Sequence, residues 1–361
     1  MGRPGHRRWV PAAAGPGAKG PGVPAGRWSL VLLAALGAGC APSAGPPARP
    51  SHALAPTTAA TPPAPAPTAP PPSPPYGLGF VQLDLVDPSR LVYPPHSGTS
   101  GPVPRQLDTG VWYPAAGPAA GAPVPGAAPL RQGGPWPLVV FAPGYDVTYQ
   151  PYLPLLEAWA RAGYVVAAPV FPLTNPSTSG GPDESDLVNE PGDLAFVIGQ
   201  LLARSAAPAD PLHGALDPSR VAVAGQSDGA IAALAVAYDT CCRDPAVRAA
   251  LVFAGEEEAL GPGSYFAAGG PPLLAAQGTA DTVNPPAYSY QLYQDAPHPK
   301  YLLVLEGADH LGPFSDSPAY EPIVARTSTD FLDAYLDGDQ AALARLATDA
   351  SPPSLARLSG P

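Results

Sequence analysis

Residues 220–236, RVAVAGQSDGAIAALAV, decide the fold of this chain. The segment opens with a valine-rich run typical of a strand buried on both faces, and closes with small apolar residues typical of a closely packed helix. Between the runs lies GQSDG (225–229), which fits the pattern Gly-x-Ser-x-Gly. The pentapeptide alone is a weak signal, because an ordinary turn with a serine at a helix start has the same form. A strand before it and a helix after it are the setting of a sharp bend that holds the Ser227 hydroxyl above a sheet edge.

Apolar strand patterns alternate with helical patterns on both sides of this segment. Helices of ten or more residues between strands produce parallel crossovers, so the sequence predicts an α/β class with a doubly wound, mostly parallel sheet. Two earlier strands alternate apolar and polar residues, as antiparallel strands do. The expected strands are 80–86, 108–113, 137–142, 164–170, 221–224, 247–254, 272–276 and 301–305. The expected helices are 152–162, 193–204, 228–238, 286–294 and a long final helix at 320–336.

The first 75 residues differ in composition from the rest. Fourteen of the 56 prolines lie in residues 41–75, and all 29 acidic groups follow residue 75. Six of the 18 basic groups lie in the first 75 residues, so the remainder has 18 − 6 = 12 basic against 29 acidic groups, a formal charge of −17. Such a part repels phosphate backbones, which argues against nucleic-acid binding. We therefore expect a leader (1–40), a disordered Pro/Ala-rich spacer (41–75) and a catalytic domain (76–361).

The leader contains an apolar run, LVLLAALGAG (30–39), that ends directly before Cys40. Ten residues are too few to span a bilayer but suit the apolar region of a secretory signal peptide. Small residues that lead into a cysteine resemble a bacterial lipoprotein cleavage site, in which Cys40 becomes the lipid-modified first residue. The prediction is a protein outside the cytoplasm, either a cell-envelope lipoprotein held to the membrane only through Cys40 or a secreted protein cleaved nearby.

The adjacent pair Cys241 and Cys242 cannot join distant elements and has no metal-ligand partners at a suitable spacing. We expect one or both to be small buried residues at a helix end, with a vicinal disulfide as the less favoured alternative.

Ser227 needs a base, because a serine hydroxyl is a poor nucleophile at neutral pH. Of the six histidines, only His310 follows a buried strand, where the carboxyl end of a sheet would present it. The acid that orients this base is expected after the preceding strand, at Asp281, and Asp309 is a rival only because it adjoins His310. The chain order Ser227, Asp281, His310 is the order expected of a triad on this fold. The other histidines lie in the leader, the spacer and loops: His6, His52, His96, His213 and His298.

Acyl transfer also needs two preorganised N–H donors for the oxyanion. We expect one from the backbone of Asp228, directly after the serine, and the other from the backbone of Tyr145, in the loop after strand 137–142. The Tyr145 ring is expected to form a wall of the acyl site. This chemistry requires no cofactor or metal.

With these residues assembled, the sequence resembles the α/β-hydrolase superfamily. Within it, the likeness is to bacterial secreted hydrolases of the polyester-hydrolase or cutinase, dienelactone-hydrolase and platelet-activating-factor acetylhydrolase-like groups. The resemblance implies an α/β-hydrolase fold, and the short segments before His310 leave no room for a lid domain. It covers residues 76–337 and rests on WYPA (112–115), PLVVFAPGY (137–145), GQSDGA (225–230), ADTVNP (280–285) and EGADH (306–310).

The chain departs from these groups around the site. Pro143 stands where relatives have histidine in the oxyanion loop, and Asp228 replaces the methionine usual in polyester hydrolases. GEEE (255–258) stands where those enzymes carry a tryptophan. An acidic rim without tryptophan offers less apolar surface to grip a polymer. A further acidic stretch, 172–191, is expected to form another rim or simply to be solvated; its acids are Asp183, Glu184, Asp186 and Glu190.

The first hypothesis is a serine carboxylesterase that acts on small or lipid-like esters with short or medium acyl chains through an acyl-enzyme. A peptidase or amidase on the same triad is the alternative, and ester and amide substrates would separate the two. A non-catalytic binding module that has kept the fold is the third reading. All three triad positions hold competent residues, which argues against it.

Overall fold

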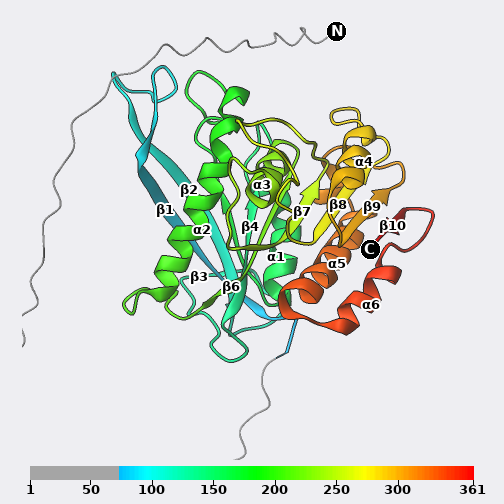
Figure 1. Cartoon of the computed structure of the whole chain (residues 1–361). Helices are drawn as coiled ribbons and strands as arrows, with labels where there is room; N and C mark the ends of the chain where they lie inside the picture. The colour runs from blue at the N-terminus through cyan, green and yellow to red at the C-terminus, as the bar shows by residue number, and fades with distance from the viewer. Residues whose placement is uncertain (1–72) are drawn as a thin grey trace, which may run out of the picture. The chain divides into compact units, whose positions relative to one another are not determined.

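A ten-stranded sheet runs through residues 73–361, the part of the chain that the computed structural model describes (Figure 1). The predicted leader, and all but the last three residues of the predicted spacer, lie outside the described residues. The strands are β1 (Gly77–Val92), β2 (Val103–Ala115), β3 (Val124–Pro125), β4 (Trp136–Ala142), β5 (Val165–Pro169), β6 (Leu216–Gln226), β7 (Val247–Phe253), β8 (Leu273–Gly278), β9 (Lys300–Leu305) and β10 (Ala356–Ser359). The α-helices are α1 (Leu153–Ala162), α2 (Glu190–Ala206), α3 (Asp228–Tyr238), α4 (Pro286–Asp295), α5 (Glu321–Leu332) and α6 (Gln340–Asp349). Short turns of helix are η1 (Gln150–Tyr152), η2 (Glu184–Asn189), η3 (Gly312–Phe314) and η4 (Asp333–Asp337).

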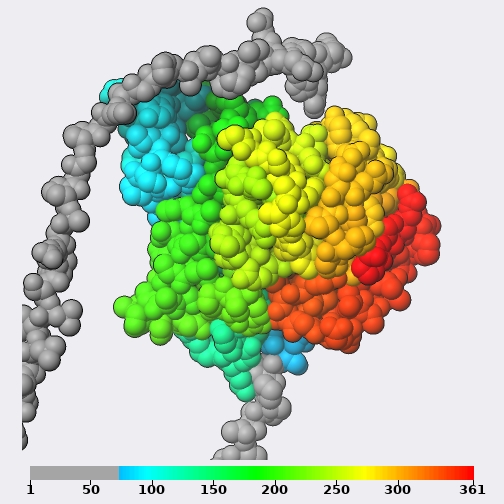
Figure 2. Space-filling view, in the orientation of Figure 1, coloured from blue at the N-terminus to red at the C-terminus, as the bar shows by residue number. Residues whose placement is uncertain are grey.

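The strand order is β10-β9-β8-β7-β6-β4-β5-β2-β1-β3. The six strands from β9 to β5 pair in parallel. Strand β2 pairs antiparallel with both β5 and β1, and β10 pairs antiparallel with β9, whereas the short β3 pairs in parallel with β1. Figure 2 shows the two ends of this sheet apart, with β1 and β2 in cyan and the C-terminal segment in red. The predicted α/β class, the mostly parallel sheet and the antiparallel N-terminal strands are confirmed, and each of the eight predicted strands is present.

The central strands are largely apolar, and β4 and β5 are apolar at every position, because both faces of the sheet are covered there. Val140 of β4 and Val223 of β6 pack on the side of α2, α3 and α4. The alternate residues Val139 and Ala222 pack on the side of α1, α5 and α6 (Figure 1). Two layers of helix thus enclose the sheet and leave its carboxyl edge for the loops.

The predicted helix at 320–336 is present as α5 and the π-helical turn η4, but it is not the final helix. The helix α5 passes into the π-helical turn η4 and ends at Gly338, whose φ of 74° favours glycine. Asp339 then caps a further helix, α6, by accepting a hydrogen bond from the Ala341 amide, and β10 follows at the sheet edge. The sequence did not predict β10, because this strand has only four residues and only one of them is buried.

Candidate active site

Ser227 lies at the bend between β6 and α3, with φ 57° and ψ −126°. This conformation is rare for a residue with a side chain, so the surroundings must hold it in place. The flanking glycines allow the bend. A Cβ on Gly225 would lie 2.1 Å from the Gly229 carbonyl oxygen, and a Cβ on Gly229 would lie 2.1 Å from that of Ala142. No larger residue fits at either position.

The structure brings Ser227, His310 and Asp281 together at the carboxyl ends of β6, β9 and β8. His310 Nε2 lies 2.9 Å from the Ser227 Oγ, and its Nδ1 lies 2.7 Å from Asp281 Oδ2. A nucleophile, a base and an orienting acid within hydrogen-bond reach are the geometry of a catalytic triad. The rival Asp309 is exposed, and its Oδ1 accepts a hydrogen bond from the Gly312 amide instead.

The carboxylate of Asp281 is buried and fully hydrogen-bonded. Its Oδ1 accepts from the amides of Val283 (2.8 Å) and Asn284 (2.9 Å). Its Oδ2 accepts from Gln277 Nε2 (3.1 Å) as well as facing His310. With its side chain fixed at four points, Asp281 can hold one ring orientation of the histidine.

The two predicted oxyanion donors are available. Gly144 lies against the serine, since a Cβ added there would be 3.1 Å from the Cβ of Ser227. The loop is further fixed by the Tyr145 hydroxyl, which donates to the Pro182 carbonyl at 3.0 Å. Within residues 73–361, neither the Tyr145 amide nor the Asp228 amide donates to a protein acceptor. Both N–H groups are therefore free to bind an oxygen of a ligand.

Gln226 is a site residue that the sequence analysis missed. Its Nε2 donates to the His310 carbonyl oxygen at 2.9 Å and lies 3.2 Å from His310 Nε2, while its Oε1 accepts from the Tyr152 hydroxyl at 2.8 Å. Burial raises the pKa of Tyr152 above its ordinary value, so the hydroxyl stays a donor. This side chain ties the histidine loop to the first strand-to-helix segment of the site. The sequence feature that could have identified Gln226 is its position, as a polar residue directly after an apolar run at the end of a strand.

Asp228 contrasts with Asp281. It is only 9% exposed, and its Oδ2 has no hydrogen-bond partner within residues 73–361. Burial, followed by the nearby Glu184, Glu258 and Glu256, raises its pKa to about 7. The pKa of the Tyr145 phenol is also raised, first by burial and then by neighbouring acids that include Glu184 and Asp228.

The acidic stretch 172–191 divides into structural and site-facing residues. Asp186 is buried in a bidentate ion pair with Arg105, which also binds Asp193 of α2. Glu190 accepts a hydrogen bond from the Thr174 hydroxyl, and burial raises its pKa well above the usual range. Asp183 caps η2 and pairs with His96 at 3.1 Å. Glu184 and Glu190 both interact electrostatically with Asp228, and of these two only Glu184 is exposed.

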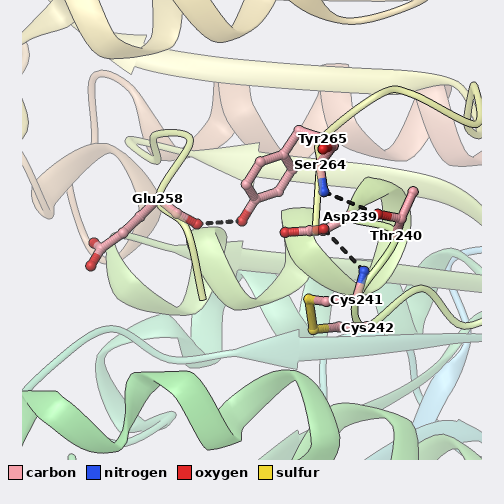
Figure 3. Close-up of a disulfide and its surroundings, with 7 residues drawn as sticks. All are labelled: Asp239, Thr240, Cys241, Cys242, Glu258, Ser264 and Tyr265. Carbon is pink, nitrogen blue, oxygen red and sulfur yellow. Dashed lines mark hydrogen bonds between the residues drawn. A yellow bond between two sulfur atoms is a disulfide. The ribbon is translucent and has the colours of Figure 1, made fainter. Parts of the chain in front are cut away.

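The preferred prediction for the two cysteines is wrong. Cys241 and Cys242 form a disulfide, Cys241 is exposed, and Cys242 is half-buried (Figure 3). The pair lies in the turn just after α3 ends, on the surface rather than beneath the helix. The turn is held by Asp239, whose Oδ1 accepts from the Cys241 amide at 3.1 Å.

No family model and no curated protein matches this chain. Among residues 73–361, no three His, Cys, Asp or Glu side chains are grouped closely enough to hold a metal ion. No helix in the same range has both the length and the apolar character to cross a membrane.

Proposed function

We propose that this protein is a serine hydrolase of the α/β-hydrolase superfamily that cleaves carboxylic esters through an acyl-enzyme. The observation that carries the proposal is the unbroken hydrogen-bonded chain from Asp281 through His310 to Ser227, at a strained turn on the carboxyl edge of the sheet. Structural histidines and aspartates form such pairs too, but they do not end on a serine held at φ 57° beside two free amides.

In the proposed reaction, His310 Nε2 accepts the hydroxyl proton while the Ser227 Oγ attacks the ester carbonyl carbon. The carbonyl electron pair moves to the oxygen, which the amides of Tyr145 and Asp228 bind. Each such donor contributes about 2.7 to 4 kcal/mol to the transition state. The alcohol leaves with the proton from His310, and the acyl group stays on Ser227. Water, deprotonated by the same imidazole, then releases the acid and restores the serine.

Acidic residues near the serine restrict the kind of ester that the site would bind. The charges of Glu184, Glu256 and Glu258 act on Asp228, directly after the serine, where a polymer-binding surface would need apolar side chains. Small esters with short or medium acyl chains are therefore the proposed substrates, and polyesters and triglycerides are disfavoured.

We also propose that the leader exports the protein and that Cys40 carries a lipid. Mass spectrometry of the mature protein from a native membrane fraction tests this. A diacylated N-terminal peptide that begins at Cys40 is expected, and an unmodified start well past Cys40 would exclude the lipid anchor.

The catalytic proposal is tested with a panel of p-nitrophenyl esters of varied acyl length and matched aminoacyl amides. Ser227→Ala should lower kcat about a millionfold and abolish labelling by a fluorophosphonate probe. Ser219→Ala, at an exposed serine near the other end of β6, is the control and should retain both. Undiminished ester turnover by Ser227→Ala with an intact fold would refute the assignment, and a preference for the amides would identify a peptidase.

A further inference from the structure

The residue directly after Ser227 carries a buried carboxylate that the proposed reaction does not use. Only the backbone amide of Asp228 has a role in that reaction. Asp228 is only 9% exposed, and one of its carboxylate oxygens has no hydrogen-bond partner within residues 73–361. A buried polar atom without a partner costs stability, and a ligand that binds this oxygen would supply the partner.

Three further carboxylates, from two different segments, lie near enough to Asp228 for their charges to raise its pKa. Glu184 begins η2, and Glu256 and Glu258 lie in the loop after β7. The charges of Glu184 and Asp228 also raise the pKa of the Tyr145 phenol, whose hydroxyl donates to the Pro182 carbonyl. Directly after the serine there is therefore a group of four acids with an aromatic side chain beside it. We call Asp228, Glu184, Glu256 and Glu258 the acidic ring.

Both segments of this acidic ring are held in place. On one side, the buried Arg105 binds Asp186 of η2, the turn that Glu184 begins. On the other side, the Tyr265 hydroxyl donates to the Glu258 carbonyl at 2.7 Å (Figure 3). The neighbouring Ser264 exchanges hydrogen bonds with Thr240 beside the disulfide. Fixed carboxylates attract a cation without the entropy cost of being ordered first.

The spacing of these acids decides which kind of cation fits. Within residues 73–361 no three acidic or other ligating side chains converge on a point that a metal ion could occupy. A metal needs its oxygen ligands at 2.0 to 2.6 Å, whereas an organic ammonium group is larger and is attracted by charges spread around it and by an aromatic face.

We propose that the substrates are esters that carry a positively charged organic group close to the scissile carbonyl, with Asp228 and Glu184 as the residues that recognise the charge. This inference rests on the proposed esterase function and adds its substrate class. A cation in the ring would supply the missing partner of Asp228 and offset the repulsion among the four carboxylates. An anionic ester of the same size should be rejected by the same charges.

The test compares matched esters that differ only in charge, on the purified full-length protein. In the first pair, butyrylthiocholine carries the charge on the leaving-group side, and 3,3-dimethylbutyl thiobutyrate is its neutral match. In the second pair, p-nitrophenyl 4-(trimethylammonio)butyrate carries the charge on the acyl side, and p-nitrophenyl 5,5-dimethylhexanoate is its neutral match. The kcat/KM ratio of charged to neutral ester is measured at low and high salt for the parent protein and for Asp228→Asn, Glu184→Gln and Glu157→Gln. The last is the control, since Glu157 lies on α1 and pairs with Arg161.

In the parent protein, at least one pair should show a ratio of about ten or more that falls with salt. Asp228→Asn and Glu184→Gln should each lower that ratio about threefold or more, and Glu157→Gln should not. Ser227-dependent hydrolysis with ratios at or below one would overturn the substrate class and leave the esterase. A ratio that stays high in both variants would overturn the assigned residues. Absence of any Ser227-dependent hydrolysis would refute the esterase proposal itself, together with this inference.

Discussion

Two pockets of the site each hold a buried carboxylate, Asp281 at 5% exposure and Asp228 at 9%. The two carboxylates differ in how many hydrogen-bond partners they have. Asp281 accepts hydrogen bonds from two backbone amides and an amide side chain and faces His310. Asp228 has one oxygen with no partner in the described part of the chain and has acids for neighbours. Burial alone therefore does not tell what an acidic residue does. The Asp281 carboxylate is held in one orientation by its hydrogen bonds, whereas Asp228 keeps one oxygen without a partner in the described part of the chain.

The largest effect that separates the two pockets is on catalysis. Asp281→Asn would put an amide donor opposite His310 Nδ1 or Gln277 Nε2, so the imidazole would be held in the wrong tautomer. We expect kcat for a neutral ester to fall about 10⁴-fold. Asp228→Asn keeps its backbone amide and should lower the same kcat about tenfold or less. Steady-state kinetics on a p-nitrophenyl ester measures both, and equal losses in the two variants would contradict the distinction drawn between them.

A buried acid can also be satisfied by a cation, as Asp186 and Asp193 are by Arg105. Hydrogen bonds with Asp193 and Asp186 outweigh burial and raise the pKa of Arg105 above its ordinary value. Arg105→Met leaves the buried Asp186 without its arginine partner and Asp193 with Arg90 alone, so it should lower the free energy of unfolding by about 3 to 5 kcal/mol. Urea denaturation measures the loss.

The control for Arg105 is Arg345→Ala. The Arg345 side chain pairs with Asp330 but is 49% exposed. Removing such a pair should cost only about 0 to 1 kcal/mol. If the two arginine variants lost equal stability, the buried network would not be what fixes the segment that carries Glu184.

The raised pKa of Asp228 should make the stability of the folded protein fall as the pH rises. The pKa of Asp228 rises from an ordinary 3.8 to about 7, so the folded state keeps a proton that the unfolded state releases between these values. Its favourable contribution is present at low pH and is lost as the pH rises through that window. Asp228→Asn should therefore be more stable than the parent at pH 8, by roughly 1 to 4 kcal/mol, and should match it near pH 4.

Asp281→Asn is the comparison at pH 8. In this variant the asparagine amide would place an N–H donor opposite the donors Gln277 Nε2 and His310 Nδ1. The variant should therefore be less stable than the parent by about 1 to 3 kcal/mol. Thermal unfolding at pH 4, 6 and 8 measures all three proteins. If the parent protein instead became more stable relative to Asp228→Asn as the pH rises, the negative charge on Asp228 would carry no penalty in the folded state.

The sequence predicted the parts of the site that follow strands. Ser227, Asp281 and His310 each come after a run of apolar residues, and the ends of parallel strands meet at one edge, so their proximity follows from local patterns. The same reasoning predicts two oxyanion donors, the amide of Asp228 in the Ser227 turn and the amide of Tyr145 in the loop after β4. These elements are predictable because periodicity and chain order determine them.

The sequence did not predict what depends on long-range packing. Nothing local shows that Arg105 is buried against Asp186 and Asp193 or that Gln226 reaches the carbonyl of His310. Nor does it show that one Asp228 oxygen has no partner among residues 73–361. The residues with partners far along the chain look like solvated polar residues until the fold places them together. The exposed disulfide was misjudged for the same reason, because the end of α3 lies at the surface and composition alone does not show it.

The smallest expected effect is that of the disulfide next to the acidic ring. Because Cys241 and Cys242 are adjacent, their bond closes a very short loop and constrains the unfolded chain little. Asp239 and Thr240 hold the same turn through hydrogen bonds to the Cys241 amide and to Ser264. Replacing both cysteines by serine should therefore lower the free energy of unfolding by about 1 kcal/mol or less. It should also leave the charged-to-neutral ester ratio within about twofold of the parent, because Tyr265 still binds the Glu258 carbonyl. Urea denaturation and the paired ester assay measure the two quantities, with the parent protein under a non-thiol reductant as the matched sample. A large fall in the ester ratio without a fall in stability would mean that the bond positions Glu258, and that the Asp228 pocket, unlike the Asp281 pocket, depends on the redox state of a surface turn.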